Sequence, residues 1–243
     1  LLERHGLRSG CFTSPHLLDF RERVRVDDAL IPRDALAEVV SERLRPSVER
    51  LRRTGERTPL HFELLCALAF ENFRRYGVDV AVVEAGLGGR LDATNAVAAT
   101  ALTAITTIGF DHMAVLGDTL GAIAAEKAAV VRSHGTVVSA PQTPEAQAVI
   151  EQVCAARSAR LWTVGREWTV HVTEERLHGT VFDVHGPGVT FDGLRVPLAG
   201  AYQAVNAAVA VAALTALRPS YPCLDEDAMR QGLAGTSWPG RLQ

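Results

Sequence analysis

The chain has 243 residues, of which 47% are hydrophobic and 22% are charged, and its net charge is −3. This length and composition allow one sizeable globular core, and the lack of excess positive charge excludes a basic surface for nucleic acid. The four cysteines are isolated in the sequence, which excludes a CxxC zinc pair and a dense disulfide framework, so we expect a protein of the reducing cytoplasm.

The two ends of the sequence look incomplete. The opening LLERHG has the pattern of a last helical turn that Gly6 closes in a left-handed conformation. The chain has no initial methionine, and it stops at WPGRLQ without a closing element. We therefore expect a piece of a longer polypeptide, in which other residues precede Leu1.

Helical and extended patterns alternate along the first two thirds of the chain. Apolar residues recur at helical spacing in the helix candidates, and the strand candidates are short β-branched runs next to glycine. In chain order the pattern predicts helices at 34–53 and 60–77, strands at 78–86 and 100–109, a helix at 119–132, a strand at 135–140, a helix at 144–158 and a strand at 160–165. This alternation predicts an α/β fold with a mostly parallel sheet flanked by helices.

The pattern changes in the last third of the chain. Between Glu167 and Pro197, alternating segments and turn residues predict a small antiparallel β patch, and an alanine-rich helix follows from about Gln203 to Leu217. The most apolar window begins at Asn206 and is too short to span a bilayer, so no membrane partner is expected. No internal repeat or low-complexity linker interrupts the chain, and we predict a single domain over residues 1–243.

Glu84 ends the strand candidate VDVAVV, whose residues are apolar on both alternating faces. Such a run is typical of a central parallel strand that is buried on both faces, and ligands of open α/β sheets bind at the carboxyl ends of such strands. The alternative is a structural carboxylate that accepts hydrogen bonds from the amides of Gly86 and Gly88. This strand alone leaves both interpretations open.

The next strand candidate, ALTAITTIG, brings Asp111 and His112 to the same predicted edge, on what we expect to be a neighbouring strand. A carboxylate and an imidazole that converge there suit a divalent cation or general acid–base chemistry. For His112 taken alone, a structural histidine is the simpler interpretation.

Lys127 lies on an apolar stripe. Leu120, Ile123, Ala124, Lys127, Val130 and Val131 follow the i, i+3, i+4, i+7 spacing of one helix face. An ammonium group on this core-facing side is either a lysine that snorkels, with its stem packed and its head in water, or one that is held among anionic groups or chemically altered.

The chain also contains five long motifs whose order and spacing resemble the folylpolyglutamate synthase and dihydrofolate synthase family of the Mur ligase superfamily. They are TSPHLLDFRERVRV, EAGLGGRLDATN, TTIGFDHMAVLGDTLGAIAAEKAAVV, LAGAYQAVNAAVAVAAL and PGRLQ, and they cover essentially the whole chain. The resemblance implies a Mur ligase-type central ATPase domain in a cytoplasmic enzyme, which we expect to be a monomer. It implies ATP and Mg²⁺ as cofactors, and folate or dihydropteroate with L-glutamate as substrates.

The activity implied by this resemblance is an ATP-dependent amide ligation. ATP phosphorylates the terminal carboxylate of the folate, and the amine of glutamate attacks the resulting acyl phosphate. By the same resemblance, the magnesium ligands fall on Ser14, Glu84 and His112, and a carbamylated lysine, a further metal ligand, falls on Lys127. Glu84, His112 and Lys127 are accordingly the expected catalytic residues.

Three further residues match the motifs of the family. Asn206 corresponds to a contact near the adenine of ATP, Arg241 to a contact near its phosphates, and Asp92 to the loop on the pterin side of the substrate. The simpler alternatives are a polar residue in the first turns of a helix for Asn206, a solvated arginine for Arg241, and a capped polar turn for Asp92.

Two features of the family are missing from this sequence. The phosphate-binding GxxGKS/T loop is absent, and so is the C-terminal Rossmann-like domain. We therefore expect a truncated central domain that binds ATP weakly and is inactive by itself. Two other functions stay open: a non-catalytic folate- or nucleotide-binding remnant, and a Mur-type ligase that acts on a cell-wall precursor. The sequence does not decide whether the enzyme only extends the glutamate tail or also uses dihydropteroate.

Overall fold

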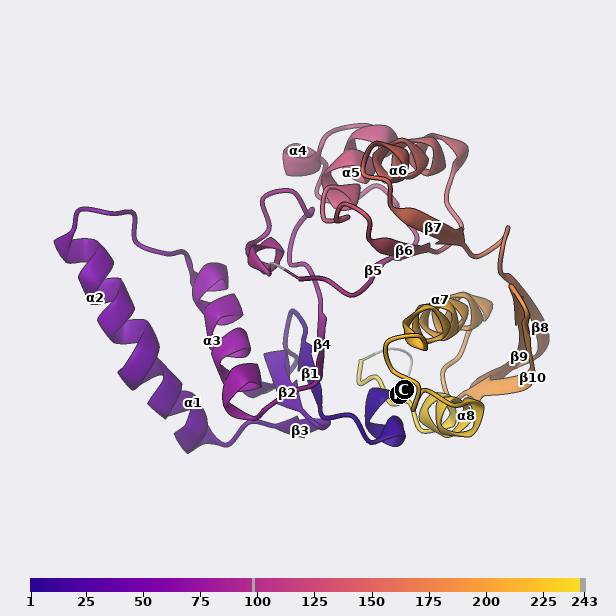
Figure 1. The fold of residues 1–243 in the computed structure, drawn as a ribbon, viewed down its shortest axis with the longest axis horizontal. Coiled ribbons are helices and arrows are strands. Elements are labelled where there is room, and N and C mark those ends of the chain that lie inside the picture. The colour runs from indigo at the N-terminus through magenta and orange to yellow at the C-terminus, as the bar shows by residue number, and fades with distance from the viewer. Residues whose placement is uncertain (98, 241–243) are drawn as a thin grey trace.

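The computed structural model describes residues 1–97 and 99–240, and it contains three β-sheets with helices packed on them (Figure 1). The expected α/β class is confirmed, because one sheet is parallel, one is mixed and one is antiparallel. No helix among the described residues is long and apolar enough to cross a membrane.

The first sheet belongs to the N-terminal third of the chain. It comprises β1 (Ser9–Phe12), β2 (Val24–Val26), β3 (Ala29–Leu30) and β4 (Val80–Val83), in the order β3-β2-β1-β4. Strand β1 pairs antiparallel with β2 and parallel with β4. The short 3-10 helices η1 (Leu2–His5) and η2 (Phe20–Arg23) lie before and after β1. Gly6 closes η1 with a φ of 74°, as predicted.

A helical rod and a second helix lie beside this sheet. The rod consists of α1 (Arg33–Val39), a π-helical segment η3 (Val40–Leu44) and α2 (Arg45–Arg53), and α3 (His61–Arg75) follows it. Pro46 has no N–H to donate to a carbonyl of the preceding turn, which accounts for the widened turn directly before it. Helix α3 buries Leu65, Ala69 and Phe73 in a core with Phe12, whereas α2 buries no residue.

The second sheet contains β5 (Thr103–Ile105), β6 (Thr136–Ser139) and β7 (Arg160–Thr163), all parallel. The short 3-10 helix η4 (Ala93–Ala96) precedes it, and α4 (Met113–Leu116), α5 (Leu120–Ala128) and α6 (Pro144–Ala156) connect its strands. Threonine side chains at 119 and 143 cap α5 and α6, which fixes where both helices begin. A core that includes Ile123, Val137 and Ile150 joins α5 and α6 to this sheet.

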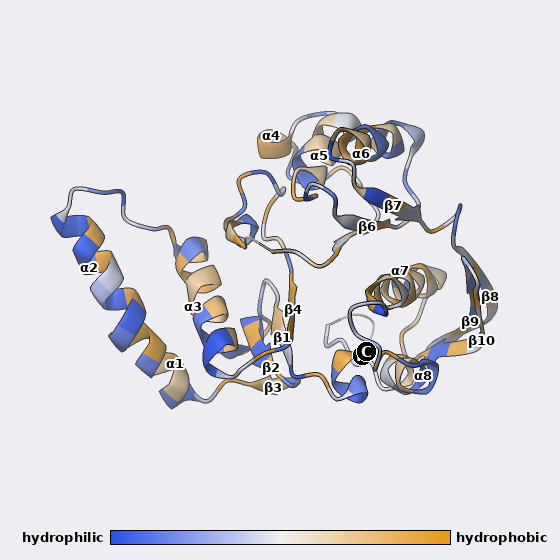
Figure 2. Ribbon diagram, in the orientation of Figure 1, coloured by the Kyte–Doolittle hydropathy of each residue, from blue (hydrophilic) through white to orange (hydrophobic). Residues whose placement is uncertain are grey.

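The third sheet is the predicted antiparallel patch. Strands β8 (Thr169–Arg176), β9 (Gly179–Gly186) and β10 (Val189–Val196) form it in sequence order, and α7 (Ala201–Leu217) and α8 (Glu226–Ala234) follow. Its core includes Trp168, Phe182 and Met229. In Figure 2 the hydrophobic colouring continues along α7, whereas α2 is mostly hydrophilic. Small alanine side chains allow α7 to pack closely against the sheet.

The prediction that VDVAVV forms a central strand buried on both faces is wrong. Among the described strands β4 pairs with β1 alone, and Val82 is 55% exposed. Strand β5 is not its neighbour, because β5 pairs with β6 and begins a separate sheet. An apolar run shows that a strand is suited to burial. Whether both of its edges are covered depends on long-range pairing with other strands, which the run alone does not predict.

Candidate functional site

Ser14 and Glu84 meet at the carboxyl ends of two parallel strands. Because Phe12 of β1 is in register with Val83 of β4, the residues that follow each strand emerge at the same sheet edge. The backbone N–H of Glu84 donates to the carbonyl of Phe12 at 2.9 Å, and the backbone N–H of Ser14 donates to Glu84 Oε2 at 2.7 Å. The structure thus places two of the predicted metal ligands together.

The loop that carries Ser14 is fixed by Glu22, a residue that the sequence analysis missed. The Glu22 carboxylate accepts hydrogen bonds from the backbone N–H groups of Leu17, Leu18 and Asp19, at 2.7, 3.0 and 2.7 Å respectively. These donors, with Leu17 first, hold the pKa of Glu22 below its ordinary value, because they stabilise the charged carboxylate. The signal was present, since Asp19 and Glu22 have the spacing of a capping box at the start of η2.

His16 lies in the same loop and is oriented by a neighbouring arginine. Arg23 Nε donates a hydrogen bond to His16 Nδ1 at 2.8 Å. An Nδ1 atom that accepts a hydrogen bond carries no proton, so a neutral His16 has its proton on Nε2. The loop therefore has a defined backbone and a defined imidazole next to Ser14.

The glycine-rich loop after Glu84 is held by Asp92. Asp92 Oδ2 accepts from the amides of Gly86 and Leu87 at 3.0 and 2.9 Å, and Oδ1 accepts from both the amide and the hydroxyl of Thr94. The alternative role that we considered for Glu84, as acceptor of the Gly86 amide, is therefore taken by Asp92. Both oxygens of Asp92 already have donors within the loop, so the side chain orders this loop.

This loop rests on the helix that carries Lys127. A Cβ atom at Gly89 would lie 2.6 Å from the carbonyl oxygen of Glu126 and 2.9 Å from that of Lys127, so only glycine fits there. The backbone N–H of Arg90 donates to the carbonyl of Glu126 at 3.0 Å, and Arg90 Nε lies 2.9 Å from Glu126 Oε1. The close approach places the end of α5 beside the residues that follow Glu84.

Lys127 itself is half-buried on α5, as its place on the apolar stripe predicted. Ile123, Ala124 and Val131 of that stripe are fully buried, which confirms that this face is directed to the core. Among the described residues, the Lys127 side chain makes no hydrogen bond or ion pair. Its role as a modified metal ligand stays a prediction.

His112 and Asp111 lie on the exposed segment between β5 and α4. His112 has a left-handed backbone with a φ of 50°, which is uncommon for a residue with a side chain, and its Nε2 lies 3.6 Å from Asp111 Oδ2. No hydrogen bond joins His112 to Ser14 or Glu84 in the described part of the chain. Within residues 1–97 and 99–240, no three His, Cys, Asp or Glu side chains are grouped closely enough to hold a metal. The predicted ligand set also contains Ser14 and Lys127, which are not of these four residue types. This absence therefore does not test the predicted set, which stays a prediction.

Of the two predicted nucleotide contacts, the structure describes Asn206 but not Arg241. Asn206 is exposed on the second turn of α7, where its Nδ2 donates to Gln203 Oε1 at 3.2 Å. Arg241 lies outside the described residues. The site that the described residues do form is an exposed sheet edge, with carboxylate and hydroxyl oxygens from two ordered loops next to an α-helix end.

Comparisons with known proteins agree on one family. A family model described as "Mur ligase middle domain" matches residues 45–214. The chain is 34% identical over 245 residues to the dihydrofolate synthase/folylpolyglutamate synthase of Bacillus subtilis, covering 100% of the chain and 56% of that relative. It is 40% identical over 251 residues to a probable bifunctional folylpolyglutamate synthase/dihydropteroate synthase of Haloferax volcanii, covering 100% of the chain and 28% of that relative.

A solved structure gives the same result. The structure described as "FPGS-AMPPCP-folate complex" matches with a TM-score of 0.93 at 34% identity, and the match covers 100% of this chain and 59% of that one. The chain therefore spans about half, or less, of the length of these curated relatives, at 56% and 28%.

Proposed function

Because this chain belongs to the folylpolyglutamate synthase and dihydrofolate synthase family of the Mur ligase superfamily, we propose that it takes part in ATP-dependent ligation of L-glutamate to the terminal carboxylate of a folate. The observation that carries this proposal is the pairing of Ser14 with Glu84 at one sheet edge, beside a glycine-rich loop fixed by Asp92. A relative that holds AMPPCP, an analogue of ATP, together with folate supports ATP and folate as the ligands. Dihydropteroate is the second acceptor that we propose, since relatives are named as dihydrofolate synthases.

The proposed reaction has two steps. A carboxylate oxygen of the folate attacks the γ-phosphorus of ATP, the bond to the bridging oxygen breaks, and ADP leaves. The amine nitrogen of glutamate then attacks the carbonyl carbon of the acyl phosphate, phosphate leaves, and the amine gives up a proton as the amide forms. Both steps bring anionic groups together, so positioning and charge compensation are the main demands on the protein.

We propose that Mg²⁺ is held by Ser14, Glu84 and His112. The residues suit this ion, because Glu84 is exposed and, among the described residues, its Oε1 and the Ser14 hydroxyl have no hydrogen-bonding partner. Mg²⁺ prefers such oxygen ligands, and when bound it offsets the negative charge of the phosphates. The left-handed backbone of His112 supports a functional role, since such conformations are frequent at active sites.

We propose that Lys127 is a carbamylated ligand of the same site. The close approach of Gly89 to the carbonyls of Glu126 and Lys127 keeps this helix end beside the loop of Glu84, and the Lys127 side chain has no ion-pair or hydrogen-bond partner among the described residues. Arginine cannot form a carbamate, so Lys127→Arg should lose activity as fully as Lys127→Ala, and a small added carboxylate should restore part of the activity of Lys127→Ala. Asn206 and Arg241 complete the proposal as contacts to the adenine and to the phosphates.

The proposal is tested by glutamate incorporation in the gene product in which this chain occurs. Folate-dependent release of ADP and uptake of labelled glutamate should both fall by the order of 100-fold in Glu84→Gln, which removes the carboxylate charge. Asp34→Asn is the matched control, because Asp34 is an exposed acid on α1 whose side chain makes no hydrogen bond or ion pair with another described residue. Near-normal turnover in Glu84→Gln, or turnover with a uridine nucleotide-linked acceptor in place of a pteroyl acceptor, would contradict the proposal.

A further inference from the structure

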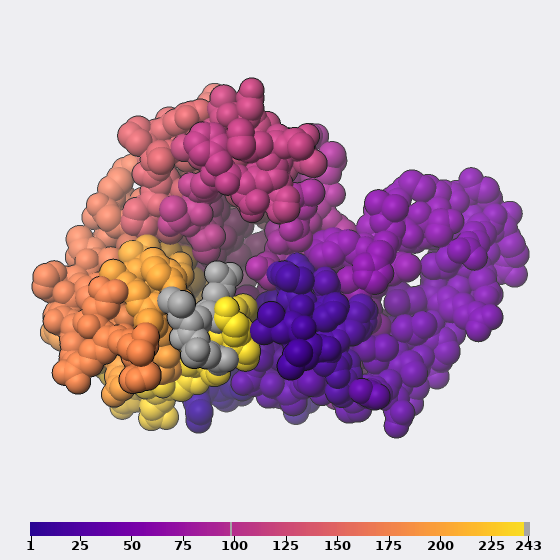
Figure 3. All heavy atoms as spheres, turned by 180° about the vertical axis from the view of Figure 1, so that it is seen from behind, coloured from indigo at the N-terminus to yellow at the C-terminus, as the bar shows by residue number. Residues whose placement is uncertain are grey.

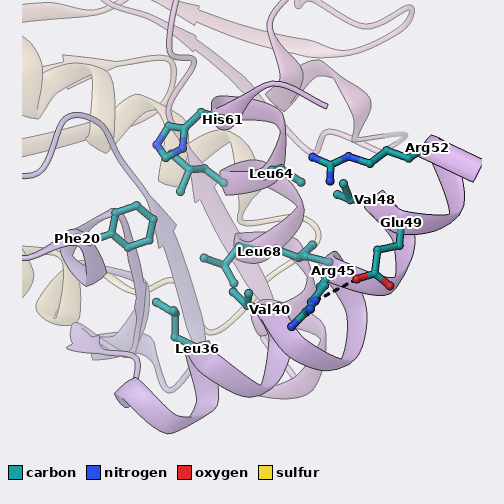
Figure 4. Close-up of a pocket in the computed structure, with 12 residues that line it drawn as sticks. Phe20, Leu36, Val40, Arg45, Val48, Glu49, Arg52, His61, Leu64 and Leu68 are labelled. Atoms are coloured by element: carbon teal, nitrogen blue, oxygen red, sulfur yellow. Dashed lines mark hydrogen bonds and ion pairs between the residues drawn. The ribbon is translucent and has the colours of Figure 1, made fainter. Parts of the chain in front are cut away.

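A cavity among the described residues lies away from the sheet edge that carries Ser14 and Glu84. It is a groove of about 410 Å³ between the helical rod and α3, and η2 borders one end of it (Figure 4). Figure 3 shows the segment that contains both helices projecting from the rest of the molecule. Since neither Ser14 nor Glu84 lines the groove, it is not part of the proposed ligase site.

The groove exists because two apolar helix faces approach each other without meeting. Leu44, Val48 and Leu51 recur at i, i+4 and i+7 on one face of the rod, yet all three are only half-buried. Leu64 and Leu68 of α3 line the opposite wall. Apolar surface left facing water in this way is a source of binding free energy for any molecule that displaces the water.

The groove lies in an arginine-rich segment, and one of the two arginines that line it has no acidic partner among the described residues. Six arginines and three glutamates lie between residues 42 and 57, in a chain whose net charge is −3. Arg45 is paired with Glu49 at 3.0 Å. Arg52 also lines the groove, and its guanidinium makes no ion pair or hydrogen bond with any described residue. In Figure 4 this guanidinium is directed across the groove toward Leu64 of α3.

The size of the groove decides what kind of molecule fits. One turn of an α-helix, about 10–12 Å wide and 5.4 Å long, occupies roughly 420–610 Å³, so a groove of about 410 Å³ holds less than one turn of a partner helix. Pockets for drug-sized molecules range from about 300 to 1,000 Å³. Volume therefore favours a small molecule over a protein segment, and the unpaired Arg52 favours one with a negative charge.

We propose that this groove binds an amphipathic organic anion, whose apolar body lies between Val48, Leu64 and Leu68 and whose acidic group pairs with Arg52. An aromatic body suits the groove best, because the rings of Phe20 and His61, whose centroids lie 6.3 Å apart, line the groove and can extend their contact to a third ring. This site does not depend on the ligase activity proposed above.

The test uses two fluorescent probes that share an apolar body and differ in charge. 8-Anilinonaphthalene-1-sulfonate carries a sulfonate, and N-phenyl-1-naphthylamine is neutral. The anionic probe should saturate a single site. Arg52→Gln should weaken its dissociation constant about tenfold or more while leaving the neutral probe unaffected, because only the anion loses a charge-assisted contact. Arg52→Lys should retain most of the affinity.

The control is Arg53→Gln, which removes an arginine from the same helix that does not line the groove. It should leave the affinity for both probes unchanged. Val48→Asp should abolish the binding of both probes, and near-ultraviolet circular dichroism checks that each variant keeps its packing. Because these side chains are not buried, the variants should fold.

Three results would overturn the proposal. One is non-saturable binding of the anionic probe, and another is an equal effect of Arg52→Gln and Arg53→Gln. The third is a dimer in sedimentation experiments that Val48→Asp abolishes, because the groove would then be covered by a second copy of the chain.

Discussion

At the scale of single residues, two carboxylates order the loops that meet at the candidate site. Glu22 accepts three backbone N–H groups of the loop after Ser14, and Asp92 accepts the Gly86, Leu87 and Thr94 amides of the loop after Glu84. Neither loop has a regular ladder of hydrogen bonds, so these side chains replace it. Among the described residues, Glu84 accepts only the Ser14 amide of this loop, through Oε2, and its Oε1 remains available to a ligand.

Asp92→Asn should loosen the glycine-rich loop. The amide nitrogen of asparagine cannot accept a hydrogen bond, so the amides that now donate to Oδ2 or those that donate to Oδ1 lose their acceptor. We expect the free energy of unfolding to fall by about 1–2 kcal/mol, measured by urea denaturation. Asp34→Asn should leave it unchanged. An Asp92→Asn protein as stable as the wild type would show that the loop finds other acceptors.

Glu22 should make the loop after Ser14 sensitive to acid. Its pKa is lowered in the folded protein, so its contribution to stability is complete above its ordinary pKa of about 4.3 and is lost as the pH falls through the lowered value. Glu22→Gln should therefore have a lower thermal midpoint than the wild type at pH 7, and this difference should shrink below about pH 4. Comparing the two proteins at each pH cancels the other carboxylates, which both share. A difference that does not change with pH would assign the loss to packing.

At the scale of elements, the edge position of β4 separates it from the strands that form the core. Val24 of β2 is 1% exposed, whereas Val82 of β4 is 55% exposed. Strand β4 is wholly apolar and β2 contains an arginine, so the difference in burial follows from their places in the sheet and not from their apolar content.

Val24→Ala and Val82→Ala form a matched pair that tests this difference. Val24→Ala should lower the free energy of unfolding by about 2 kcal/mol, because it removes two buried methyl groups and leaves a cavity. Val82→Ala should change it by less than about 0.5 kcal/mol, because its side chain is already in contact with water. Equal losses in urea denaturation would mean that β4 is covered in solution.

Many of the elements could be predicted from the sequence, but the short elements β1, β2, β3 and α4, the helix α8 and the pairing of the strands were not predicted. The apolar periodicity predicted the rod, α3, α5 and α6 and the antiparallel patch at 167–197, because these signals are local. The placement of β4 and β5 in separate sheets depends on contacts between residues far apart in the chain. The same limit applies to the site: Glu84 was found from its strand end, whereas the partners of Asp92 became evident only in the folded loop.

At the scale of the whole molecule, three hydrophobic cores are arranged along the chain, and one strand connects two of them. Val138 of β6 belongs to the core around Trp168, and its neighbour Val137 belongs to the core around Ile123. The core around Phe12 and Val24 contains no residue of β6. Since alternate residues of a strand face opposite sides, β6 ties these two cores together through two fully buried side chains, whereas β4 links the cores around Trp168 and Phe12 only through the partly buried Val80 and Val83.

This arrangement predicts two unfolding transitions. Two of the three tryptophans, Trp162 and Trp168, pack in the core on one side of β6, so tryptophan fluorescence reports on the tied unit, while far-ultraviolet circular dichroism reports on all helices. Ile123→Ala lies across β6 from those tryptophans and should still move the fluorescence midpoint, because a loss of about 3 kcal/mol in one core destabilises the strand that both share. Val24→Ala should move part of the dichroism transition and leave the fluorescence midpoint in place. If Val24→Ala moved both signals together, the chain would unfold in one cooperative step, and the first sheet would be coupled to the rest through contacts stronger than the separate cores imply.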